Sequence, residues 1–307
     1  MPLQIAPVIA LGVFALIVPL ASIAPQYAPP TLLHALPASA RPVYANFGHV
    51  ELIGYETLDT RYERGDDVPI TVYWRVVEPS ERDLSLWLHA VNDAGETLGT
   101  VDSYPGVGRL RTTTWQPGAI YADGYVISLT NFMGGVSRLR VQVGWWHYPS
   151  QDNIGAVDEN SQPLESVMLN VGGYFDTTPI WHLGDFTVME PVEFGDSINL
   201  KLYRLNGNEL SLWWEVTGAL DDEYTVFVQV LDEGNNIIGQ GDAAPVLPTQ
   251  YALPGDQFGT SHSIIYPQQP PVGTYRVLVG WYAPDDFARL GADYPDSAYP
   301  LTTIEIP

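Results

Sequence analysis

The acidic side chains of this sequence are its first candidates for chemistry, because clustered carboxylates can bind calcium. The densest acidic segment near the C-terminus contains Asp285, Asp286, Asp293 and Asp296. Their spacing does not match the loop of an EF-hand. We therefore predict no dedicated metal site and name these four aspartates as the calcium candidates.

Two further aspartates, Asp102 and Asp242, occur at the same place in two similar halves of the chain, shortly before Pro105 and Pro245. A carboxylate ahead of a turn commonly accepts backbone N–H groups and so holds the loop in place. We expect that structural role, with calcium binding and catalysis as the alternatives.

Motifs of the common enzyme classes are missing from the sequence. It contains no P-loop, no G-x-G-x-x-G, no H-E-x-x-H and no G-x-S-x-G. The six histidines are scattered, without the spacing of metal ligands. The sequence thus predicts a protein that is not an enzyme and needs no cofactor. An acidic site assembled in space from distant residues stays open as the alternative.

Aromatic residues offer a second route to function. Successive side chains of a strand point to opposite faces, and this alternation places several aromatic residues on the face opposite the inward apolar rows. These residues are Tyr73, Trp87, Trp146, Trp213 and Tyr282. An exposed ring can contact a protein partner or stack on a sugar. The structural alternative is that these rings cover the sheet beneath a neighbouring domain or linker.

The charge of the chain narrows its range of partners. The 307 residues include 36 acidic and 13 basic side chains, which gives a net charge of −23 at pH 7. Nucleic acid and anionic membrane surfaces would be repelled. Cysteine is absent, so neither disulfides nor thiolate metal sites can stabilise the fold.

The N-terminal segment has the composition of a membrane anchor. Residues 5–24 form an almost purely apolar, uncharged run, close to the roughly 20 residues that a helix needs to cross a bilayer. A cleaved signal peptide is the alternative, but no basic residue precedes the run. We expect a transmembrane anchor at 1–24, a Pro/Ala-rich stalk at 25–42, and the bulk of the chain to be extracytoplasmic.

An internal repeat organises the rest of the chain. Residues 70–74 correspond to residues 210–214, and the same offset of 140 aligns Gly99 with Gly239. A repeat of only two units is too short for a solenoid, so we predict two independent domains with few contacts between them. The expected boundaries are 43–172 for the first domain, 173–191 for the linker and 192–307 for the second domain.

Both copies show the two-residue hydrophobic period of half-buried strands. Trp74 in the first copy and Trp214 in the second fall in the inward rows. One buried face per strand is what two antiparallel sheets packed together require. We predict an all-β fold, with two tandem immunoglobulin-like antiparallel β-sandwich domains after one N-terminal transmembrane helix.

The repeated motifs resemble a known module. Phe-Gly, Ile53-Gly-Tyr55, Tyr73-Trp74, Pro-Gly and Arg-Val-x-Val-Gly-Trp are similar to the β-sandwich that follows the last membrane helix in some bacterial relatives of the protein mannosyltransferases, glycosyltransferase family thirty-nine. The resemblance implies an envelope-facing accessory domain of sugar-transfer machinery. Those transferases need many membrane helices, and this chain has one candidate, so no catalytic residue is carried over.

Three classes of function remain. The first is a non-catalytic, membrane-anchored structural or interaction subunit of a cell-envelope or membrane complex, whose partners are other membrane or envelope proteins. The second is a carbohydrate-binding accessory module of a glycosyltransferase system. The third is an enzyme with a spatially assembled acidic site.

Overall fold

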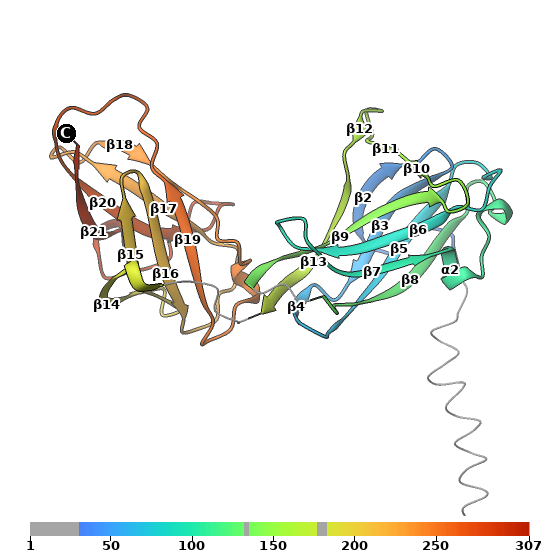
Figure 1. Cartoon of the computed structure of the whole chain (residues 1–307), viewed down its shortest axis with the longest axis horizontal. Coiled ribbons are helices and arrows are strands. Elements are labelled where there is room, and N and C mark those ends of the chain that lie inside the picture. Colours follow the sequence, from blue (N-terminus) through green and yellow to red (C-terminus); the bar gives the residue numbers. More distant parts are fainter. Residues whose placement is uncertain (1–30, 132–134, 177–182, 307) are drawn as a thin grey trace, which may run out of the picture.

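The computed structural model of the chain describes residues 31–131, 135–176 and 183–306. It has an all-β fold of four sheets, which form two pairs along the chain (Figure 1). The anchor expected at residues 1–24 lies outside the described residues. In the part of the chain that is described, no helix combines the length and apolar character that a membrane crossing requires.

The first pair of sheets, which ends at Asp176, is the first copy of the repeat. One sheet has the strand order β1-β8-β5-β3-β2-β11-β12, and the other has the order β4-β13-β9-β6-β7, with β10 paired to β9. The strands are β1 (Thr31–Leu33), β2 (Arg41–Asn46), β3 (Val50–Thr57), β4 (Thr60–Glu63), β5 (Asp67–Val76), β6 (Ser85–Val91), β7 (Thr97–Ser103), β8 (Ile120–Ser128), β9 (Gly135–His147), β10 (Asp152–Ile154), β11 (Ala156–Val157), β12 (Pro163–Leu164) and β13 (Val167–Asp176). Two short helical turns, α2 (Pro105–Gly108) and η4 (Thr112–Thr114), lie between β7 and β8.

The second pair of sheets is the second copy of the repeat. Its sheets have the orders β14-β15-β16-β19 and β18-β17-β20-β21. The strands are β14 (Thr187–Phe194), β15 (Ile198–Asn206), β16 (Glu209–Val216), β17 (Thr225–Leu231), β18 (Ile237–Gln240), β19 (Gln257–Ser263), β20 (Gly273–Tyr282) and β21 (Tyr299–Ile306). The short helical turns are η5 (Leu183–Asp185), η6 (Thr249–Tyr251) and η7 (Pro295–Ser297).

Each copy has its own core, built around a pair of tryptophans from facing sheets. Trp74 of β5 meets Trp145 of β9 edge to face at 4.9 Å, and Trp214 of β16 meets Trp281 of β20 in the same way at 4.8 Å. All four rings are at most 1% exposed. Edge-to-face pairs at this separation add to the energy gained by burying the rings. The β-sandwich-like fold and the inward positions of Trp74 and Trp214 are therefore confirmed.

The segment before β2 differs from the stalk that was expected at 25–42. Within its described part, Thr31–Leu33 forms the edge strand β1, which pairs with β8. The side chain of Leu36 lies against Gly54, where an added Cβ would come within 2.9 Å of it. The backbone N–H and C=O groups of this segment find hydrogen-bond partners on β8, which makes it a strand of the sheet.

The two copies contact each other through a bidentate ion pair, which differs from the few contacts expected across the linker. Arg61 of β4 donates hydrogen bonds of 2.5 and 3.2 Å to the two carboxylate oxygens of Asp256, just before β19. Only 17% of the Arg61 side chain and 10% of the Asp256 side chain are exposed. Nearby, the hydroxyl of Tyr251 donates to Asp59.

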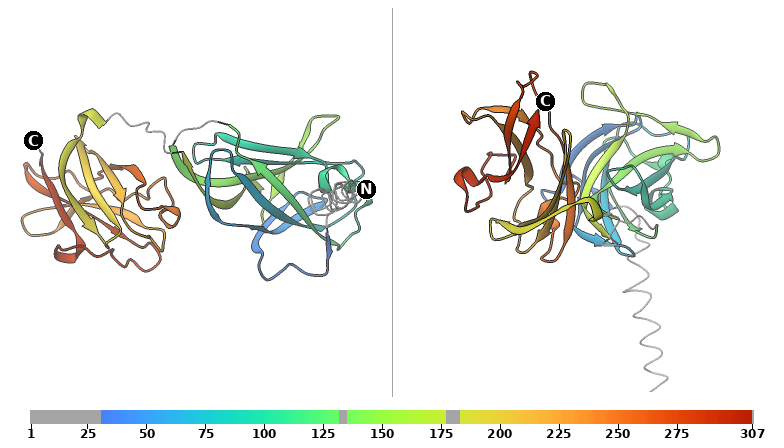
Figure 2. Two further views of the ribbon diagram at one scale, coloured as in Figure 1. Left: turned by 90° about the horizontal axis from the view of Figure 1, so that it is seen from below. Right: turned by 60° about the vertical axis from the view of Figure 1, so that its left-hand side comes forward.

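Phe175, near the end of β13, is a second contact between the copies. Its ring belongs to the buried cluster of the second copy, and the guanidinium carbon of Arg61 lies 3.7 Å from the ring centre. The strand that ends the first copy thus reaches the second core, while the copies remain separate bodies along the long axis of the molecule (Figure 2). β13 extends to Asp176 and β14 begins at Thr187, so strands occupy both ends of the segment expected as a linker.

Candidate functional site

The outer surface of the β7-β6-β9 sheet in the first copy carries two half-buried tryptophans with polar side chains beside them. Leu86, Leu88 and Ala90 of β6 point into the core and are buried, so the residues between them point outward. We call this surface the Trp87 face. It consists of Trp87, His89, Asp102, Gln142 and Trp146.

Trp87 lies flat on the sheet because its neighbour in β9 is a glycine. Trp87 pairs opposite Gly144, and a Cβ added to Gly144 would lie 2.1 Å from Cζ2 of the indole. Any other residue at this position would push the ring away. The half-buried ring therefore packs directly against the backbone of Gly144.

A histidine and an aspartate border the ring. The His89 imidazole lies 4.9 Å from the Trp87 ring at a tilt of 41°, and His89 Nε2 is 3.3 Å from Asp102 Oδ1. Asp102 sits directly opposite Trp87 on β7. Because 49% of the Asp102 side chain is exposed, its carboxylate can accept hydrogen bonds or attract a cation at the border of the ring. Asp102 thus pairs with a side chain, whereas a loop-holding role was expected.

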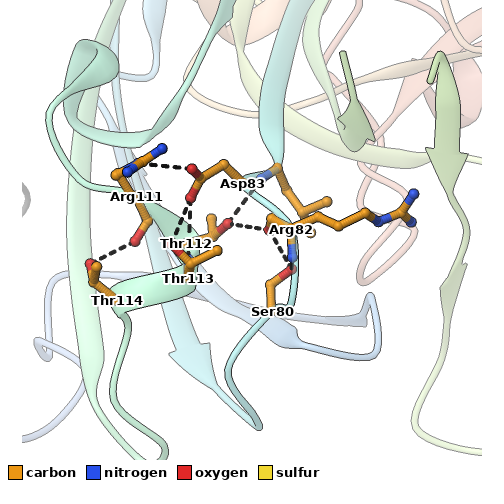
Figure 3. A network of polar contacts seen from close by, with 8 residues as sticks. Ser80, Arg82, Asp83, Arg111, Thr112, Thr113 and Thr114 are labelled. Carbon is orange, nitrogen blue, oxygen red and sulfur yellow. Dashed lines mark hydrogen bonds and ion pairs between the residues drawn. The ribbon is translucent and has the colours of Figure 1, made fainter. Parts of the chain in front are cut away.

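The loop that leads into β6 is fixed by a polar network (Figure 3). Thr112 accepts a hydrogen bond from the N–H of Leu84 at 2.9 Å and donates to the carbonyl of Arg82 at 3.0 Å. Asp83 accepts from Arg111 Nε at 2.8 Å and from the Thr113 hydroxyl at 2.9 Å. These bonds end one residue before β6, so they support the register of the strand that carries Trp87.

The same loop is fixed in the same way in the second copy. Thr249 accepts from the N–H of Tyr224 at 2.8 Å and donates to the carbonyl of Asp222 at 2.7 Å. Thr112 and Thr249 are 3% and 1% exposed. The network is thus part of the duplicated fold, and the difference between the copies lies on their outer faces.

In the second copy the position of Trp87 is occupied by Phe227, which is covered. Phe227 also lies on a glycine, since a Cβ on Gly280 would come within 2.5 Å of its ring. The guanidinium carbon of Arg289 lies 4.4 Å from the centre of the Phe227 ring. Phe227 is only 2% exposed, whereas Trp87 is half-buried.

The five aromatic residues that the sequence predicted as contact residues differ in exposure. Trp146 and Tyr282 are half-buried and occupy equivalent places at the ends of β9 and β20. Tyr73 and Trp213 are 3% and 7% exposed, so neither can contact a partner in the folded chain. Tyr73 faces away from the core as expected, but it is buried, and it pairs with Gly54 and Ala122 of the adjacent strands. The structure thus leaves Trp87 and Trp146 together on one face.

Asp242 has the loop-holding role that was expected of it. Its Oδ1 accepts a hydrogen bond of 3.2 Å from the backbone N–H of Val228. This hydrogen bond ties the segment between β18 and η6, which contains Asp242, to the backbone of β17.

The four calcium candidates are exposed and serve different local roles. Asp286 accepts from the N–H of Ala288 at 2.8 Å, and the carbonyl of Asp296 accepts from Arg289 at 2.6 Å. Across the described ranges, no three Asp, Glu, His or Cys side chains are placed to hold a metal ion. Asp285 and Asp293 therefore do not join the other two in a metal site in this part of the chain.

A cleft of 520 Å³ in the second copy has three acidic residues in its lining. It lies between the β14–β15 turn and the segment before η7, and Glu193, Asp196 and Asp293 are its acidic lining residues. The other lining residues are Pro191, Val192, Gly195, Gly291, Ala292 and Tyr294. The hydroxyl of Tyr294 is the sole side-chain hydrogen-bond donor among these lining residues.

Two buried polar pairs lie inside the sandwiches. In the first copy, the hydroxyl of Tyr125 donates to Asp123 at 2.5 Å, and burial raises the pKa of Asp123 to about 6. In the second copy, His262 contacts Thr260 Oγ1 and the carbonyl of Gly241, each at 2.8 Å. Burial lowers the pKa of His262 to about 4. Both pairs are closed off from solvent, so they act on stability rather than on a ligand.

The sequence contained signals for the Trp87 face that its alternation pattern did not expose. The glycine of each Val-Gly-Trp motif, Gly144 and Gly280, lies under an aromatic ring of the neighbouring strand. A repeated glycine in a strand interior marks such a close approach. The covering role of Arg289 had no sequence signal, because it depends on a loop that folds over the sheet.

Comparison with known proteins gives remote structural likenesses. A DUF4785 family protein from Legionella pneumophila subsp. pneumophila str. Philadelphia 1 is 13% identical, with a TM-score of 0.25, over 85% of this chain and 58% of that one. This chain therefore spans little more than half the length of that protein. The sporulation control protein Spo0M from Bacillus subtilis is 15% identical, with a TM-score of 0.23, over 57% of this chain and 80% of that one. No protein-family model matches the chain, and no curated protein matches it.

Proposed function

We propose that this chain is a non-catalytic interaction subunit that contacts its partner through the Trp87 face. The observation that carries the proposal is the difference between the copies. The Trp87 ring is half-buried, whereas the equivalent Phe227 is 2% exposed beneath a segment of its own chain. An aromatic ring held rigidly on a sheet loses little conformational entropy on binding, which is why tryptophans dominate the energy of many interfaces.

The setting of this interaction follows from the sequence pattern. We propose immunoglobulin-like topology for each sandwich, a single-pass anchor at residues 1–24 and an extracytoplasmic location for the bulk of the chain. The resemblance to the module of mannosyltransferase relatives supports a place in a cell-envelope or membrane complex. The partners would be other membrane or envelope proteins.

Carbohydrate binding is the second candidate, and the polar border of Trp87 favours it. A flat ring can stack on the apolar face of a sugar, while Asp102, His89 and Gln142 supply acceptors and donors for its hydroxyl groups. The chain would then be an accessory module of a glycosyltransferase system.

Quantitative co-purification tests the proposal. The full chain would be captured from membranes in mild detergent as the wild type, as Trp87→Ala and as Phe287→Ala. Phe287 is the matched control, because it is an exposed aromatic residue of the second copy, at 73% exposure.

The proposal predicts a partner that is retained by the wild type and by Phe287→Ala and is lost with Trp87→Ala. Equal retention by all three chains, with the fold of Trp87→Ala intact, would refute it. Recovery of the chain on an immobilised glycan in a Trp87-dependent manner, without a protein partner, would support the second candidate instead.

A further inference from the structure

In the second copy, the surface equivalent to the Trp87 face is covered by the side chain of Arg289. Arg289 pairs opposite Tyr282 at the end of β20, and its side chain extends over Phe227 on the adjacent strand. Its Nη1 also donates to the carbonyl of Asp296 at 2.6 Å. A guanidinium over an aromatic ring at 4.4 Å is a cation–π contact.

The first copy has the same framework with a different residue at the position of the arginine. Asn153 of β10 pairs opposite Trp146, just as Arg289 pairs opposite Tyr282. Asn153 is exposed, and an asparagine is too short to extend over the next strand. Asn153 therefore leaves the ring of Trp87 uncovered. Among aromatic side chains, tryptophan attracts cations most strongly.

The charges around Trp87 favour a cation in that place. Asp102 lies directly opposite the ring and is half exposed. Three basic groups of the same copy are already paired, since His89 meets Asp102, Arg140 meets Asp93 at 2.7 Å and Arg82 meets Asp152 at 2.9 Å. The net charge of −23 adds a long-range attraction for basic partners.

We infer that the Trp87 face binds an arginine side chain presented by a protein partner. The guanidinium stacks on the Trp87 indole, as that of Arg289 stacks on Phe227, and its N–H groups are directed toward the Asp102 carboxylate. Arginine fits better than lysine because its planar, weakly hydrated group can stack on a ring and donate in its own plane at the same time. This inference rests on the proposed function and names the chemistry of the partner.

A peptide titration tests the inference on the full chain in mild detergent. The probes are the capped tripeptide Gly-Arg-Gly and the same peptide with citrulline, a neutral isostere of arginine. Binding is followed by fluorine NMR of the chain labelled with fluorotryptophan, in which Trp87→Ala assigns the signal of Trp87. Loss of the charge should weaken binding to the wild type about tenfold, of which roughly three- to tenfold comes from the cation–π contact. On Trp87→Ala, the same peptide change should cost no more than about threefold.

A substitution within the chain provides the matched control. Asn153→Arg should place a guanidinium over Trp87 in cis, shift the Trp87 signal without any peptide, and weaken Gly-Arg-Gly binding at least about fivefold. Asn153→Gln, which adds length without charge, should leave binding within about twofold.

The outcomes separate this inference from the proposed function. Equal arginine-to-citrulline ratios on the wild type and on Trp87→Ala overturn the inference, and so does a glycan that shifts the Trp87 signal when the peptide does not. In either case, a partner that still co-purifies in a Trp87-dependent manner leaves the interaction function standing. Loss of that dependence as well removes both.

Discussion

Asp123 and Thr260 occupy the same register position in the two copies. Asp123 pairs opposite Val72 in β5, and Thr260 pairs opposite Leu212 in β16, which lies 140 residues after Val72. Both side chains are buried, at 1% and 4% exposure. The fold thus reserves a polar position inside each sandwich. In the first copy Asp123 itself titrates there, whereas in the second copy the titratable group is His262, which contacts Thr260 Oγ1 at 2.8 Å, and the two groups respond to pH in opposite directions.

The first copy should lose stability as the pH rises. Asp123 has a folded pKa of about 6, above its ordinary value near 4, because burial disfavours the carboxylate. The folded state therefore binds the proton more tightly than the unfolded state, and its stabilising effect is lost as the pH rises from about 4 through 6. Hydrogen exchange of β8 amides should report a free energy of opening that is lower at pH 8 than at pH 4.5 by about 2 kcal/mol. In Asp123→Asn this difference should shrink to the background of the other groups, and an unchanged difference would contradict the assignment.

The second copy should lose stability as the pH falls. His262 has a folded pKa of about 4, below its ordinary value near 6.5, because burial disfavours the imidazolium. Here the unfolded state binds the proton more tightly, so stability is complete above about pH 6.5 and falls as the pH drops toward 4. Amides of β19 should be less protected at pH 5 than at pH 7.5 by about 2 kcal/mol. Equal protection at the two pH values would show that His262 titrates normally.

Replacing the two core tryptophans by phenylalanine should give unequal losses. Trp214 Nε1 donates to Thr260 Oγ1 at 2.9 Å, whereas Trp74 Nε1 is buried without a partner in the described part of the chain. Denaturant unfolding should show Trp214→Phe to be about 1 kcal/mol more destabilising than Trp74→Phe, because only the first change removes a hydrogen bond. The excess should vanish in a Thr260→Val background. Each Trp→Ala change should cost about 3–5 kcal/mol.

The ion pair between the copies should couple their unfolding. Arg61 and Asp256 are largely buried together, so removing one partner leaves a charge without compensation. Arg61→Ala should cost about 3 kcal/mol and should separate the melting of the two copies in calorimetry. The exposed pair Arg111–Asp83, with the arginine at 74% exposure, supplies the control, and Arg111→Ala should cost no more than about 1 kcal/mol. A single unchanged transition in Arg61→Ala would show that the other contacts between the copies, such as Phe175 and the Arg138–Glu223 pair, suffice to couple them.

The all-β fold and the core could be predicted because they depend on local alternation and on the repeat. The rows around Trp74 and Trp214 point inward as their two-residue period requires. The same pattern also placed Tyr73 and Trp213 on the outer side of their strands, but alternation does not show what lies over that side. Both rings are nevertheless buried, opposite the glycines Gly54 and Gly259 of the adjacent strands.

The candidate site could be predicted only in part, for a related reason. The sequence singled out Trp87 and Trp146, which the structure places on one face. It gave no reason to separate Trp87 from its counterpart Phe227, because the difference arises from the segment that carries Arg289. Such a tertiary cover is set by loop geometry, which a two-residue hydrophobic period does not encode.

Site-specific photocrosslinking in the cells that make the chain tests the central claim most directly. A photoreactive residue at Thr100 of β7 would sit beside His89 on the Trp87 face, and the same residue at Gln240 of β18 would occupy the equivalent place in the second copy. Both positions are exposed. Our account predicts a partner adduct from position 100 that disappears with Trp87→Ala, and little adduct from position 240. Equal adducts from the two positions, or an adduct from position 100 that persists without Trp87, would contradict it.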